Sequence, residues 1–180
     1  LVTRTPVAAG LLTLATVVLG ASIYLQGDRI IGDADEGVPE LRPDSRYNQD
    51  SRAIARNFAI GTDILRVIAE TDPEACIQYD VMEQIDRFGW HMRNVDGVSS
   101  TVSLPQVARQ VNAAFSEANP MYGVLPRNRY TMVQAITPVP TSSGLLNPDC
   151  SAMAVLNFTE DHKAGTIDRV LNAVERFDRE

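Results

Sequence analysis

The scarce reactive side chains of this sequence are two cysteines, Cys76 and Cys150, and two histidines, His91 and His162. A structural zinc site needs four such ligands at matched spacing, and a thiol redox centre needs a Cys-x-x-Cys pair. Neither pattern occurs. We expect His91 to stabilise the end of a helix and His162 to lie in a solvated turn. The sequence therefore predicts no metal site, no cofactor and no catalytic residues, and we do not expect an enzyme.

Two further motifs carry weaker chemical signals. Asp33, Asp35 and Glu36 have the early spacing of a calcium-binding loop, but a glycine occupies the next ligand position. We interpret this run as a solvated acidic turn. The tripeptide that begins at Asn157 is a formal glycosylation acceptor. Because we expect it within or beside a strand, we do not assign it as a modification site.

Residues 7–25 form an uncharged apolar run of the length that spans a membrane as a helix. A cleaved signal peptide would have a shorter apolar core. Arg4 precedes the run, and an acid-rich segment follows it. The positive-inside tendency therefore predicts that the N-terminus is cytoplasmic and that residues after about 26 are extracytoplasmic.

This location bears on the two cysteines, because disulfides persist outside the cytoplasm. We expect a disulfide between Cys76 and Cys150, although two separate buried thiols remain the alternative at this stage. All 23 acidic residues and all but one of the 16 basic residues follow the apolar run, and the net charge is -7. Nucleic-acid binding requires a basic surface, so nucleic acid is not an expected partner.

The elements expected to position these residues alternate between strands and helices. Residues 62–69 read as a strand buried on both faces. The Thr71 capping signal predicts a helix over 73–93, and similar signals predict helices over 105–117 and from Thr166 to about 177. The remaining expectations are a lead-in over 27–61 with a short helix at 48–58, strands at 98–103 and 152–158, a helix at 130–136, and loops at 119–129 and 137–149. Arg127 and Arg129 lie in the first of these loops, where we expect them to be solvated.

This order predicts an α+β protein: one transmembrane helix (1–26), an extracytoplasmic lead-in (27–61), and an α+β subdomain (62–180). The subdomain matches most of a split β-α-β, ferredoxin-like unit. Its last strand is missing from the pattern, which leaves an unpaired sheet edge. We interpret the chain as a fragment of a longer protein.

The sequence GDADEGVPELRPDSRYNQD at 32–50, directly after the apolar run, resembles the start of the outer loop in predicted exporters of the resistance–nodulation–division superfamily, of the MMPL-like kind. The same resemblance extends over residues 76–79, 90–95, 103–107, 125–130 and 157–164. It implies a proton-driven permease of a bacterial inner membrane with periplasmic porter subdomains. The implied partners are the remainder of the permease, other permease subunits, the membrane, and an amphiphilic or lipid-like substrate.

Two other classes of function stay open from sequence. The chain could be a single-pass anchored extracytoplasmic binding or sensor domain. An anchored hydrolase is a third option, which would require a nucleophile and a base within hydrogen-bonding reach.

Overall fold

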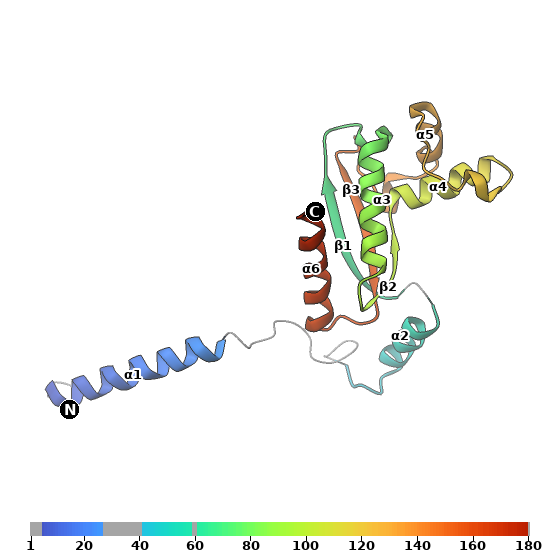
Figure 1. The fold of residues 1–180 in the computed structure, drawn as a ribbon. Helices are drawn as coiled ribbons and strands as arrows, with labels where there is room; N and C mark the ends of the chain where they lie inside the picture. Colours follow the sequence, from blue (N-terminus) through green and yellow to red (C-terminus); the bar gives the residue numbers. More distant parts are fainter. Residues whose placement is uncertain (1–4, 27–40, 59–60, 180) are drawn as a thin grey trace. The chain divides into compact units, whose positions relative to one another are not determined.

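The computed structural model describes residues 5–26, 41–58 and 61–179 and confirms an α+β fold (Figure 1). The chain divides into two compact units, Leu1–Gly32 and Asp33–Glu180. The first contains the apolar helix α1 (Thr5–Gln26). In the second, α2 (Arg46–Asn57) begins at Ser45, whose hydroxyl accepts a hydrogen bond from the Asn48 N–H. The acidic run at 33–36 lies outside the described residues.

The second unit contains a three-stranded antiparallel sheet in the order β1-β3-β2. Its strands are β1 (Asp63–Glu70), β2 (Val98–Val102) and β3 (Ala152–Thr159). Two strands that follow one another through a helix, β1 and β2, flank the third. This is the strand arrangement of a split β-α-β unit. Consequently β1 is an edge strand of this sheet.

Two helices cover one face of the sheet (Figure 1): α3 (Tyr79–Arg93) and α6 (Ala164–Asp178). They meet through an edge-on contact between Phe88 and Phe177, with ring centroids 5.1 Å apart. The core beneath them consists of apolar side chains from both helices and from β3, which include Met82, Ile85, Met92, Met153, Val155, Val170 and Ala173. The buried α3 residues Ile85, Phe88 and Met92 follow one another at helical spacing and so lie on one face of the helix.

On the opposite face of the sheet, none of the described helices covers β1. Exposure alternates along this strand, and Ile64 and Ile68 are 44% and 57% exposed. The prediction that the strand is buried on both faces is therefore wrong. The central strand β3 is mostly buried on both faces, and it pairs with β1 and β2 along its two edges.

Two predicted helix starts also differ from the structure. Helix α3 begins after Gln78, preceded by the 3-10 turn η1 (Ala75–Ile77). The N–H of Thr71 donates instead to Ser151 O at 2.8 Å, which extends the β1–β3 pairing. Helix α6 begins at Ala164, and the hydroxyl of Thr166 donates to Asp161 Oδ1 at 2.6 Å. Both threonines therefore serve tertiary or loop contacts and not the predicted caps.

Between β2 and β3 the chain forms an arm that projects from the sheet (Figure 1). It contains α4 (Leu104–Phe115), η2 (Pro120–Tyr122), α5 (Arg129–Ile136) and η3 (Thr141–Ser143). Helices α4 and α5 pack on one another through buried Leu104, Ala108, Met132 and Ala135. The arm is thus a helical insertion with its own contribution to the core.

Candidate functional site

Helix α1 carries the membrane-related feature of the chain. Its segment Pro6–Leu25 is long and apolar enough to cross a membrane, and none of it is buried. The hydroxyls of Thr13 and Thr16 donate to the carbonyls of Ala9 and Leu12, at 3.0 and 2.9 Å. These hydrogen bonds within the helix satisfy the two hydroxyl groups, for which lipid tails offer no hydrogen-bonding partner. In the part of the chain that the structure describes, one helix, near the N-terminus, is therefore suited to membrane anchoring.

The second feature is a disulfide between Cys76 and Cys150. The Cα atoms are 5.5 Å apart, and 74 positions separate the two residues in sequence. Cys76 lies in η1 after β1, and Cys150 lies in the turn that enters β3. Both are buried. The sulfur bridge therefore ties the two strand ends together at one end of the sheet.

Backbone contacts surround this bridge. The Glu74 N–H donates to Asp149 O at 2.8 Å, and the Thr71 hydroxyl donates to Cys150 O at 3.3 Å. The N–H and hydroxyl of Ser151 donate to the Asp149 carboxylate. These bonds hold the pKa of Asp149 below its ordinary value. Cys150 itself has a φ of 59°, in the left-handed region, within this tight turn.

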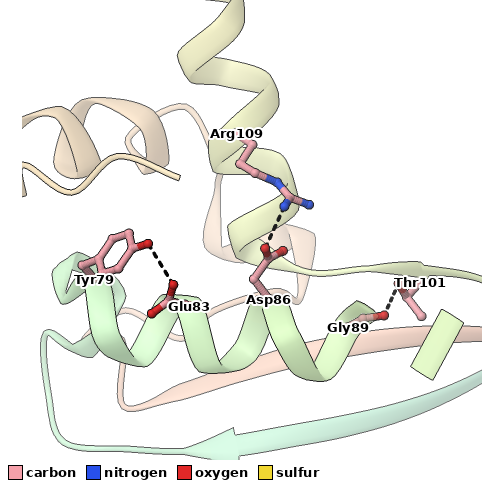
Figure 2. A network of polar contacts seen from close by, with 6 residues as sticks. All are labelled: Tyr79, Glu83, Asp86, Gly89, Thr101 and Arg109. Carbon is pink, nitrogen blue, oxygen red and sulfur yellow. Dashed lines mark hydrogen bonds and ion pairs between the residues drawn. The ribbon is translucent and has the colours of Figure 1, made fainter. Parts of the chain in front are cut away.

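Polar contacts on α3 fix the arm to the domain (Figure 2). Arg109 Nη1 of α4 lies 2.7 Å from Asp86 Oδ2 of α3, and both side chains are mostly buried, at 28% and 23% exposed. Thr101 Oγ1 of β2 donates to the Gly89 carbonyl at 3.3 Å. The two contacts tie neighbouring elements to α3 and place no nucleophile beside a base.

Two open grooves lie beside α6. One, of about 720 Å³, has a basic lining that includes Arg169, Arg176, Arg179 and His91. The other, of about 510 Å³, lies between α3 and α6 at β1 and has a mostly apolar lining. Sequence reasoning missed both grooves. The spacing of Arg169, Arg176 and Arg179 on one helical face was the available signal for the first.

The histidines singled out from sequence lie apart. His91 Nε2 lies 3.1 Å from Ala173 O, and its ring lies 5.5 Å from that of Phe177, so it bridges α3 and α6. His162 Nδ1 lies 4.0 Å from Asp63 Oδ1. Partial burial raises the pKa of Asp63, an effect that the attraction of His162 opposes. Within residues 5–26, 41–58 and 61–179, no group of three or more His, Cys, Asp or Glu could hold a metal ion.

Three other residues from the sequence are also engaged. Asn157 is fully buried in β3, and its Nδ2 donates to Leu65 O at 3.2 Å, so the folded chain does not present it for glycosylation. Arg127 lies over the Tyr79 ring at 5.2 Å, and Arg129 pairs with Glu74 at 3.2 Å. Both loop arginines are exposed, as expected, and each also contacts the domain.

Comparisons with known proteins give no relative for this chain: no family model, no curated protein and no solved structure matches it.

Proposed function

We propose that the chain is part of a proton-driven exporter of amphiphilic or lipid-like molecules, and that it contributes one membrane helix and part of an extracytoplasmic porter region. The observation that carries the proposal is the combination of α1 with a disulfide-closed split β-α-β domain. The sequence resemblance is its other support.

The proposed role of the domain is mechanical. A sheet with helices on one face, closed by a sulfur bridge at one end, moves as one body against neighbouring domains. Such rigid-body motion opens and closes clefts between domains. The energy for the motion comes from membrane helices of the remainder of the permease, because α1 carries no side chain suited to a proton relay.

Placement relative to the membrane is the first test. In intact cells of a bacterium that expresses the chain, Tyr130→Cys is labelled with a membrane-impermeant maleimide. The Tyr130 side chain is 85% exposed, so the reagent has access to this position. Thr3→Cys, before the span, is the matched control and reacts only after lysis. Labelling of both positions in intact cells, or of neither, contradicts the proposed topology.

Transport is the second test. Deletion of the coding sequence raises the steady-state accumulation of an amphiphilic fluorescent dye, and a protonophore abolishes the difference between the two strains. Equal accumulation in the two strains before the protonophore is added refutes an exporter.

An anchored extracytoplasmic binding domain is the second candidate, and the open basic groove at Arg169, Arg176 and Arg179 favours it. In that case the purified chain in lipid nanodiscs binds a small anion. In cells, dissipating the proton gradient does not change dye accumulation through this chain. Replacing Arg176 and Arg179 by glutamine abolishes that binding but leaves dye accumulation unchanged.

A further inference from the structure

The outer edge of β1 has backbone groups that point away from the sheet. The Thr71 N–H donates to Ser151 O, and the register pairs Val67 with Val155. Backbone groups alternate between the two edges of a strand. The N–H and C=O groups of the odd-numbered residues of β1 therefore point toward β3. The even-numbered ones, Ile64, Arg66, Ile68 and Glu70, direct their N–H and C=O groups outward. No other described strand pairs with this edge.

An apolar groove lies directly beside the same edge. It is the 510 Å³ groove between α3 and α6, and its lining includes Val67 and Ala69 of β1, Phe88 of α3, and Phe177 of α6. Val67 and Ala69 are only partly buried, although they belong to the helix-covered face of the sheet. The groove is therefore the space that a neighbouring strand's inward side chains would fill.

Acidic residues also line this groove. Glu175 and Asp178 belong to α6, and Glu70 ends β1 with its side chain on the same face as Ile64 and Ile68. On that face of β1, Ile64 and Ile68 are exposed. A strand beside β1 would thus meet apolar surface on both of its faces and negative charge at one end.

We propose that the outer edge of β1 is a docking site for an extended polypeptide strand that pairs antiparallel with β1, is apolar at alternate positions, and is basic where it passes Glu70. Strand addition of this kind takes its affinity from main-chain hydrogen bonds and its specificity from alternate side-chain pockets. Antiparallel pairing is the arrangement of the rest of the sheet. The inference does not depend on the transport proposal, because it uses only the edge and the groove.

The probe is a fluorescent peptide, Lys-Thr-Val-Thr-Val-Thr-Val-Thr, added to the full chain in phosphatidylcholine nanodiscs. Valines enter the groove, and threonines lie opposite the even-numbered residues. In an antiparallel pair, residues opposite outward-facing positions exchange the hydrogen bonds. N-methylation of the threonines therefore abolishes binding, and N-methylation of the valines preserves it. Empty nanodiscs and a peptide with its valines grouped together are the controls.

Arg66→Pro tests the protein side of the site. The substitution removes an outward N–H but no β1–β3 bond, and an edge strand tolerates proline at such a position. We expect the affinity for the peptide to fall about tenfold. The proline removes one well-formed hydrogen bond to the peptide, and its ring keeps the peptide backbone from approaching β1 closely. Arg66→Thr keeps the N–H and is the matched control, with unchanged affinity.

Three results overturn the proposal. The first is the absence of peptide binding to the wild-type chain. The second is equal binding of the two N-methylated peptides, which means that the groove takes apolar groups without strand pairing. This comparison uses the unmodified protein, so it holds even if Arg66→Pro does not fold. The third is a wild-type dimer that Arg66→Pro makes monomeric, because a second copy then occupies the edge.

Discussion

Removal of the Cys76–Cys150 disulfide should strongly destabilise the domain. The bridge closes a loop across 74 positions of sequence. In the chain-entropy account, a loop of that length restricts the unfolded chain enough to stabilise the fold by about 4 kcal/mol. Native domains commonly have a total stability of about 5–15 kcal/mol. The variant that replaces both cysteines by alanine should therefore retain a marginal fold.

The assay is urea unfolding of the full chain in nanodiscs, followed by circular dichroism. With a urea dependence of roughly 2 kcal/mol per molar, the midpoint should fall by roughly 2 M. Reduced wild-type chain should match the double-alanine variant, and a reductant should have no effect on that variant. A decrease in the free energy of unfolding of less than about 1 kcal/mol would refute the reasoning. The bridge would then restrict the unfolded chain far less than the chain-entropy account requires.

Three other predictions follow from particular contacts. A double-mutant cycle of Asp86→Ala and Arg109→Ala should give a coupling of about 1 kcal/mol in unfolding experiments, and a coupling near zero would mean that the contact is only geometric. Burial tends to raise the pKa of Asp161, but hydrogen bonds led by the Thr166 hydroxyl outweigh it, so the folded-state pKa is lowered. Thr166→Val should therefore cost about 1 kcal/mol of stability above the unfolded-state pKa of this carboxyl, and the cost should disappear as the pH falls through the folded-state pKa; a pH-independent difference would contradict this. Val17→Arg should reduce the fraction of chain that resists carbonate extraction from membranes, because arginine at a helix centre costs about 2.5–3.5 kcal/mol of insertion; complete retention would contradict a spanning role for α1.

The elements of the fold were largely predictable because their signals are local. The apolar run predicted α1, and local signals predicted α4 and α6 to within about two residues. They also predicted the end of α3 at Arg93, but its start lies six residues later than expected, at Tyr79. Strand β3 also matched its apolar run. Each of these patterns lies within about twenty consecutive residues and is determined by backbone geometry.

Capping signals failed where a distant contact competed. The hydroxyl and N–H of Thr71 bond to Cys150 and Ser151, which lie far away in sequence. A helix cap contributes about 1 kcal/mol, so two hydrogen bonds from another strand are enough to outweigh it. At Thr166 the competing contact is local. This residue lies two positions inside α6, which begins at Ala164, and its hydroxyl donates to Asp161, five positions earlier.

By itself, the sequence determined that an apolar helix precedes an acidic α+β region, because hydropathy and periodicity are properties of neighbouring residues. The element order also indicated a split β-α-β unit, in which the third strand lies between the first two. Only the tertiary structure decided that Cys76 and Cys150 meet and that α3 and α6 contact one another over the sheet. Alternation along β1 indicates which side chains share a face, but the packing of distant helices decides which face is covered. The open edge and the apolar groove beside it arise from that packing.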